Sequence, residues 1–189
     1  MFNDHHPYWH VRSIVEQHEN ISHVSYSRYT YTPQTVEDTR QIGSMQREQF
    51  LDPKHIEEII LATPPGQELA IHSNFLLSNG ETNHLVMVDM ATSSQAHLEK
   101  LRIFLGDNLF KNILWFSSGR SFHGYGSNLL NERDWIKFMG LLLLANRPHF
   151  GWTVDPRWIG HRLIAGYAAL RWTKNTDYYI NMPRKIISP

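Results

Sequence analysis

The sequence contains no cysteine and no excess of charge of either sign. Without cysteine, disulfide bonds, thiolate zinc sites and cysteine nucleophiles are excluded. Lysine plus arginine number 18, and aspartate plus glutamate also number 18. The protein therefore has no overall field that attracts phosphate, and any nucleic-acid binding has to depend on a local patch.

Long hydrophobic runs are also missing. The longest, residues 141–145, is much shorter than the roughly 18 apolar residues that a membrane helix needs. The first residues lack the basic and then apolar layout of a secretory signal. We therefore expect no membrane contact and a cytoplasmic location. With 41% hydrophobic and 19% charged residues, the chain of 189 residues is typical of one globular domain.

Hydrophobic periodicity divides the chain into helices and strands. Asp52 followed by Pro53 predicts a helix N-terminus, and Asn79-Gly80 predicts a tight hairpin turn. Segment 34–50 is polar and ambiguous, with a helix followed by a loop after Gly43 as one interpretation, and segment 157–167 is amphipathic but equally ambiguous. The predicted helices cover residues 8–19, 52–62, 94–105 and 131–145, and the predicted strands cover 23–32, 68–77, 84–90, 111–117, 120–125, 152–155 and 168–173.

The stretch 115–125 combines an apolar run, a Ser-Ser-Gly turn and a polar alternating segment. Side chains i and i+2 share one face of a strand, so Ser121 and His123 should point one way while Arg120 and Phe122 point the other. A hydroxyl and an imidazole beside a glycine turn form a candidate anion site. An ordinary hairpin whose serines bond their own backbone explains the pattern equally well.

Two aspartates stand at the ends of predicted strands. Asp89 follows the apolar run 85–88, and Asp155 ends the segment 152–155. A carboxylate after four buried residues indicates a partner or a metal, because charges are rarely buried alone. The alternative is that Asp89 or residues 92–94 cap the next helix. Two acidic residues brought together hold a divalent cation through hard oxygen ligands.

Basic and aromatic residues gather toward the C-terminal end, with only Asp177 against them. This composition suits phosphate pairing and base stacking. It equally suits a buried aromatic core with a solvated basic rim. The basic members are Arg157, His161, Arg162, Arg171, Lys174, Arg184 and Lys185, and the aromatic members are Trp158, Tyr167, Trp172, Tyr178 and Tyr179.

The order of these sites resembles the archaeo-eukaryotic primase superfamily, which comprises small-subunit primases and primase-polymerases. Its members carry aspartates after a hydrophobic strand, then Ser-x-His commonly preceded by Gly-Arg, then a hydrophobic residue and Asp before a basic stretch. The resemblance covers roughly residues 68–174. The matching residues are Val88-Asp89, Ser118–His123 and Val154-Asp155, with Arg162-Leu163 and Arg171 or Lys174 in the basic stretch.

The resemblance implies an α+β fold in which an RRM-like antiparallel sheet carries the motifs, with an N-terminal mixed α/β lobe and a cleft between them. A single domain, residues 1–189, would comprise an N-terminal lobe (1–66), a motif-bearing lobe (67–175) and a C-terminal tail (176–189). The implied activity is metal-dependent, template-directed nucleotidyl transfer, with Mg²⁺ or Mn²⁺ as cofactor. Nucleoside triphosphates and a single-stranded nucleic-acid template would be its ligands, and a helicase or accessory primase subunit is an open question as a partner.

The resemblance also assigns roles to single residues. Asp89 and Asp155 would be metal ligands and, together with His123, the catalytic residues. Arg120 would contact a phosphate group or the template. The residues implied in nucleotide binding are Ser121, His123, Arg120, Arg162 and Lys174.

The first motif departs from the usual pattern of two aspartates separated by one residue, because Ala91 stands in the second position. Glu81 and Glu99 are candidate substitutes for the missing carboxylate. A branch with a single aspartate would look like this, and so would a degenerate module that binds nucleotide or nucleic acid without turnover. A third alternative is a metal-dependent phosphodiesterase, for which the candidate histidine ligands are His72, His84 and His161.

Overall fold

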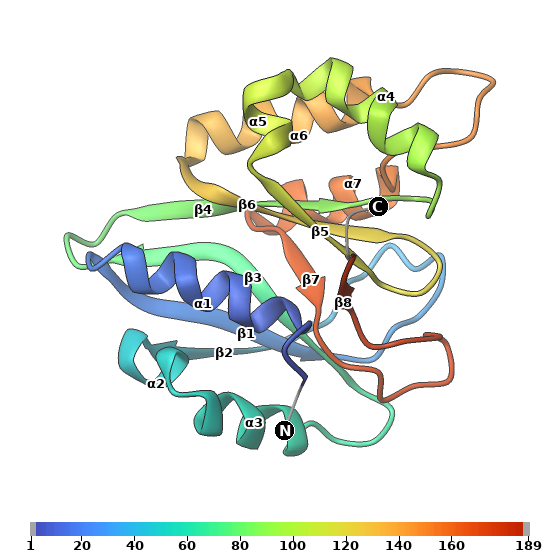
Figure 1. Cartoon of the computed structure of the whole chain (residues 1–189). Coiled ribbons are helices and arrows are strands. Elements are labelled where there is room, and N and C mark those ends of the chain that lie inside the picture. The colour runs from blue at the N-terminus through green and yellow to red at the C-terminus, as the bar shows by residue number, and fades with distance from the viewer. Residues whose placement is uncertain (1–2, 187–189) are drawn as a thin grey trace.

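A computed structural model describes residues 3–186 as an α+β fold built on one antiparallel sheet (Figure 1). The predicted class, with an RRM-like antiparallel sheet, is confirmed. The strands of the described part are β1 (Ile21–Tyr29), β2 (Gln41–Gln46), β3 (Glu68–Leu77), β4 (Thr82–Asp89), β5 (Ile113–Ser117), β6 (Phe122–Asn131), β7 (Ala169–Arg171) and β8 (Arg184–Lys185). The helices are α1 (Pro7–Gln17), α2 (Arg47–Leu51), α3 (Pro53–Leu61), α4 (Gln95–Leu105), α5 (Asp107–Lys111), α6 (Glu132–Leu144) and α7 (Pro156–Ala165).

Several elements begin and end where their local chemistry requires. The Asp52 side chain accepts a hydrogen bond from the backbone two residues on, at 3.0 Å, and so caps α3. Asn131 caps α6 in the same way, at 2.9 Å. The β3–β4 hairpin turns at Gly80, whose φ of 85° favours glycine. The four predicted helices, which correspond to α1, α3, α4 and α6, and the predicted hairpin are confirmed.

The sheet branches at β3. The strand order is β2-β1-β3-β4-β6-β5-β8, and β7 pairs with β3 as well. β1 pairs along one edge of β3, so β4 and β7 share the other edge: β4 takes residues 74–76 and β7 takes residues 70–72. Ser73 lies between the two, where its Oγ accepts from Ala168 N at 2.9 Å. The ends of β4 and β7 beyond this branch point belong to different arms of the sheet.

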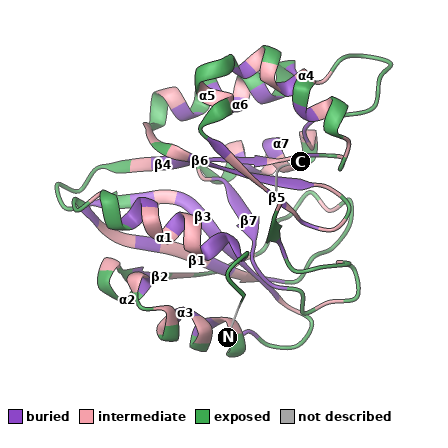
Figure 2. Cartoon of the chain, viewed as in Figure 1, coloured by how far each residue is buried: buried purple, intermediate pink, exposed green. Residues whose placement is uncertain are grey.

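Buried residues gather along the central strands of the sheet (Figure 2). Residues 85–88 of β4 are fully buried, which explains why this strand is apolar throughout rather than alternating. α6 packs against β4 and β6 and buries Trp135 and Phe138, while α1 contacts β6 and α2. Within residues 3–186, no helix combines the length and the apolar character needed to cross a membrane.

Two interpretations have to be corrected, and one segment that the sequence left ambiguous is assigned. Residues 152–155 form only an isolated bridge between Val154 and Met90, because the Asn146 side chain bonds the backbone of Thr153 and Val154 at 2.8–3.1 Å. Segment 34–50 contains β2 and α2 instead of a helix and a loop. The ambiguous segment 157–167 lies mostly in α7.

The predicted division into lobes remains a prediction. β1 and β3, which lie on either side of the expected boundary after residue 66, are paired antiparallel over most of their length. β8 falls within the predicted C-terminal tail and pairs with β5. Residues 1–2 of the predicted lobe and 187–189 of the predicted tail lie outside the described residues.

Candidate functional site

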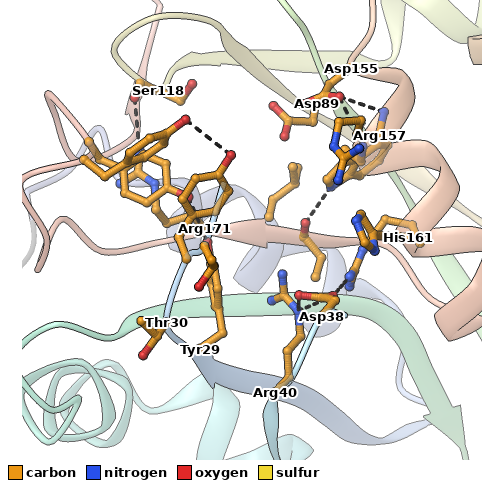
Figure 3. A pocket seen from close by; sticks show the side chains of 18 of the residues that line it. Tyr29, Thr30, Asp38, Arg40, Asp89, Ser118, Asp155, Arg157, His161 and Arg171 are labelled. Carbon is orange, nitrogen blue, oxygen red and sulfur yellow. Dashed lines mark hydrogen bonds and ion pairs between the residues drawn. The ribbon is translucent and has the colours of Figure 1, made fainter. Parts of the chain in front are cut away.

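A cavity of about 590 Å³ opens where the sheet branches (Figure 3). Its walls come from the end of β1 and the following segment 30–40, the ends of β4 and β7, the β5–β6 turn, the start of α7 and residues 178–180. This volume is within the range of small-molecule sites. The predicted residues that line it are Asp89, Arg120, Ser121, His123, Asp155 and Arg162.

Asp89 ends β4 and faces the cavity with 24% of its side chain exposed. Burial, and then the neighbouring charge of Asp155, raise the pKa of Asp89 to about 8, against the weaker opposing effect of Arg171. The carboxylate therefore pays a desolvation cost that a bound cation would relieve. It caps no helix, so the capping alternative for Asp89 is wrong.

Asp155 is held next to Asp89 by the backbone, since Asp155 N donates to Asp89 O at 3.0 Å. Its Oδ1 accepts from the backbone N–H groups of Arg157 and Trp158, at 2.8 and 3.2 Å, and so caps α7. No hydrogen bond within residues 3–186 uses its Oδ2. One oxygen thus fixes the start of α7 while the other is available to a ligand in the cavity.

His123 lies opposite Asp89 in the β4–β6 register, with His123 Nε2 and Asp89 Oδ1 3.6 Å apart. Burial, followed by the charge of Arg171, lowers the pKa of His123 to about 3. The imidazole is therefore neutral at pH 7 and forms no ion pair with Asp89. Its Nδ1 is buried and has no hydrogen-bond partner among the described residues. We call Asp89, Asp155 and His123 the carboxylate end of the cavity.

The β5–β6 turn carries the Ser-Gly-Arg-Ser sequence. Ser118 and Ser121 bond each other through their Oγ atoms at 2.9 Å and through the backbone at 3.0 Å. Ser121 shares the cavity with His123 as predicted, but exposed Arg120 lines it too, with Cζ 5.4 Å from the Tyr178 ring. Arg120 precedes β6, so the strand alternation that should have turned it away does not apply.

The basic stretch divides into buried and exposed members. Arg171 donates to the carbonyl groups of Thr173, Ser118 and Asn181 and lies over Tyr179, with Cζ 3.9 Å from the ring centroid. Arg162, in the last turn of α7, is buried in the part of the cavity wall that this helix forms. The predicted nucleotide-binding residue Lys174 is exposed and is not among the residues that line the cavity.

Sequence reasoning missed the residues of the β1–β2 connection. Arg40 and Arg162 both contact the carboxylate of Asp38, and we call these three residues the arginine end of the cavity. Tyr29 also lines this end. The available signal was only the polar character of this connection, because binding residues are disproportionately found on loops.

The tail that leads to Tyr178 and Tyr179 is fixed by a buried carboxylate. Glu68, at the start of β3, accepts from the Thr173 hydroxyl at 2.5 Å and from Thr176 N at 2.9 Å. It also accepts from Asn175 N at 3.0 Å. These bonds hold both tyrosines in the cavity wall.

The carboxylate end fits one hard cation. Asp89 and Asp155 supply carboxylate oxygens, which Mg²⁺ and Mn²⁺ prefer, and the raised pKa of Asp89 is the property that a dication would reverse. In the described part of the chain no group of three or more His, Asp or Glu side chains is arranged to hold a metal. Further ligands would have to come from water or from phosphate oxygens.

The candidate substitutes do not complete this set. Glu81 bonds Asn79 in the β3–β4 turn at 2.9 and 3.0 Å, and Glu99 pairs with Arg102 on α4. Neither lines the cavity, whereas Ala91 does. His72 and His84 are buried against aromatic rings and do not line it either; of the three candidate histidines, only His161 does.

The motifs that resemble the primase superfamily, with Asp89, Ser121, His123 and Asp155, thus face one cavity at the branch of an antiparallel sheet. The family model described as AEP-like, archaeo-eukaryotic primase 1D-like, matches residues 47–184. The match covers more than half of the chain, so the chain belongs to this family and to the archaeo-eukaryotic primase superfamily. No curated protein matches the sequence.

Proposed function

We propose that the protein is a metal-dependent nucleotidyltransferase, a primase or primase-polymerase that joins nucleotides on a nucleic-acid template. The observation that carries this proposal is the convergence of Asp89, Asp155 and His123 on the cavity that also holds Arg120, Arg162 and Arg171. The carboxylates would hold Mg²⁺ or Mn²⁺, and the arginines would pair with phosphate groups.

The residues of the chain contribute mainly position and charge. A cation bound between Asp89 and Asp155 would neutralise the charge that develops on the transferred phosphate group. Neutral His123 would donate one hydrogen bond to a phosphate oxygen, and the Ser121 hydroxyl would donate another. Arg120, which is exposed and lies beside Tyr178, would contact a phosphate group or the template.

The test is incorporation of labelled nucleotides by the purified protein with Mn²⁺ and a single-stranded template. Asp89→Asn keeps the shape of the side chain but removes its charge, and we expect incorporation to fall by on the order of 100-fold or more. Asp107→Asn is the matched control, since Asp107 is an exposed aspartate on α5 outside the cavity. Absence of template-dependent product, or product unaffected by Asp89→Asn, would contradict the proposal.

A catalytically degenerate binding module is the second candidate, and Ala91 favours it. The methyl group of Ala91 lines the cavity where a second carboxylate of the motif would stand, so the second cation of a two-metal reaction lacks a ligand. Nucleotide binding without turnover, in Mg²⁺ and in Mn²⁺, would select this function. The metal-dependent phosphodiesterase is tested in the same assay by release of nucleotides from a single strand.

The expected partners follow from the proposed activity. They are nucleoside triphosphates and a single-stranded template. Copurification from cells tests whether a helicase or an accessory primase subunit is also a partner. The cytoplasmic location expected from the sequence also stays a prediction, which fractionation of cells checks.

A further inference from the structure

The arginine end of the cavity contains one carboxylate shared by two guanidinium groups (Figure 3). Arg40 Nε donates to Oδ1 and Oδ2 of Asp38 at 3.0 and 2.8 Å, and Arg162 Nη2 pairs with Oδ2 of the same side chain. Asp38 belongs to segment 30–40, which contains no helix or strand, whereas Arg162 is on α7. One carboxylate therefore links a connecting loop to a helix.

The charges at this end do not balance. The side chains of Arg40 and Arg162 are only 10% and 2% exposed, and burial lowers the pKa of both guanidinium groups. Asp38 supplies one negative charge for two positive charges. Nη1 of Arg162 is also buried without a hydrogen-bond partner in the described part of the chain. The arrangement lacks one negative charge and one acceptor, which a phosphate group supplies.

The two arginines are fixed, while the aspartate is the movable member. Arg40 lies over the Tyr29 ring, with Cζ 4.0 Å from its centroid, and donates to Ser27 Oγ at 3.1 Å. A planar guanidinium held in this way is ready for bidentate binding of phosphate oxygens. Asp38 is 25% exposed on its irregular segment, so its side chain has solvent to move into.

We propose that Arg40 and Arg162 form a phosphate-binding subsite and that the Asp38 carboxylate occupies this subsite until a phosphate group displaces it. The inference deepens the proposed function and rests on it for the origin of the phosphate, a nucleotide or the backbone of a nucleic acid. Displacement releases Asp38 to solvent, while Arg157 Nη2 still holds the segment through Thr35 O at 2.6 Å. If Asp38 served only to position the arginines, its loss would disorder them and would weaken phosphate binding instead of strengthening it.

The test is calorimetric binding of inorganic tripolyphosphate in EDTA, which removes the contribution of a metal at the carboxylate end. Asp38→Asn should bind about 10-fold tighter than the wild type, since a charged competitor worth at least about 1.4 kcal/mol is removed. Glu37→Gln is the matched control: it makes the same charge change on the adjacent cavity-lining residue, which forms no ion pair within residues 3–186. Weaker binding by Asp38→Asn, or a gain no larger than that of Glu37→Gln, overturns the proposal.

A second measurement uses the wild type and so does not depend on the folding of the variant. Hydrogen exchange of segment 30–40 should accelerate when tripolyphosphate binds, because the Asp38 anchor is released. A positioning role for Asp38 predicts slower exchange, and that result overturns the proposal.

The source of the phosphate is decided by a thymidine oligonucleotide that carries no terminal phosphate. If Asp38→Asn raises the affinity for the oligonucleotide as much as the affinity for tripolyphosphate, the subsite binds backbone phosphates. If it raises the affinity for tripolyphosphate alone, the subsite binds the phosphates of a nucleotide. These experiments need no turnover, so failure of nucleotide incorporation leaves their outcome intact, and the reverse also holds.

Discussion

At the carboxylate end of the cavity, strand register and a helix cap fix the functional groups, whereas at the arginine end burial and contacts with tyrosine rings fix the two guanidinium groups, and a loop carboxylate bridges them. Asp89 and His123 are partners in the β4–β6 ladder, and Asp155 is bonded to Asp89 through the backbone. Arg40 and Arg162 meet only through Asp38. At the first end the acidic side chains are therefore held by the fold itself, while at the second end the acidic side chain, Asp38, should be removable without loss of the arginine geometry.

The largest expected effect concerns Asp155, which caps α7 and is also proposed to bind a cation. Asp155→Asn retains a capping oxygen but loses the charge, whereas Asp155→Ala loses both. We expect both variants to lose about 100-fold or more in nucleotide incorporation. Only Asp155→Ala should also lose about 1 kcal/mol in the free energy of unfolding, measured with urea. Equal stability of the two variants would mean that the cap does not hold this end.

The next effect tests whether strand packing fixes the carboxylate end. A Cβ at Gly124, next to His123 on β6, would lie 2.7 Å from the Trp115 side chain. Gly124→Ala should therefore cost about 1–3 kcal/mol of stability in urea unfolding. Gly140→Ala on α6 is the control, because a Cβ there meets nothing within 4 Å and should stabilise the helix by about 0.5–1 kcal/mol.

The third effect compares His123 of the carboxylate end with His72, a buried histidine outside the cavity and near the arginine end. The pKa of His123 and that of His72, which lies near Arg40, are both lowered to about 3, chiefly by burial. Below the unfolded pKa of 6.5 the unfolded chain binds more protons, so stability is present above pH 6.5 and is lost as the pH falls toward 3. Each histidine should contribute a slope of up to about 1.4 kcal/mol per pH unit.

The measurement is urea unfolding of the wild type, His72→Gln and His123→Gln at pH 7.5, 6.5 and 5.5. Each variant should show a shallower loss of stability with acid than the wild type. Unchanged slopes in both variants would show that neither imidazole is buried in its neutral form.

The smallest effect concerns Asp89, whose pKa is raised to about 8. Its protonated form is favoured by folding, so its contribution to stability is present at low pH and is lost as the pH rises from about 4 to 8. Without divalent metal, Asp89→Asn should gain stability relative to the wild type as the pH rises over this range, an effect that the partial exposure of the carboxylate reduces. Thermal unfolding at pH 4, 6 and 8 checks this, and a constant difference would contradict it.

Local chemistry made the carboxylate end predictable. The apolar run before Asp89, the Asn79-Gly80 turn and the Ser121-x-His123 alternation each act within a few residues, so the sequence reveals them directly. Asp155 was correctly placed beside Asp89, although residues 152–155 are not a strand, because Asn146 takes the backbone bonds that a neighbouring strand would have used.

The arginine end was not predictable for a physical reason. Asp38 and Arg162 are more than a hundred residues apart in the chain, and neither stands in a periodic pattern that points to the other. Only the pairing of β1 with β3, and of β3 with β7, brings segment 30–40 to α7. Lys174 was predicted from its place in a basic stretch that resembles the family's, and neither this resemblance nor composition distinguishes the wall of a cavity from its exterior.

The Glu68 anchor has a consequence for the order in which the protein folds. Its partners Thr173 and Thr176 follow it by more than a hundred residues, and β3 obtains its last neighbour only from β7. Contacts at such sequence separation form slowly, because a long loop has to close first. During synthesis the β1–β4 part of the sheet is complete before this wall of the cavity exists. The emerging chain therefore completes the wall of this cavity last, as one of the final steps of folding.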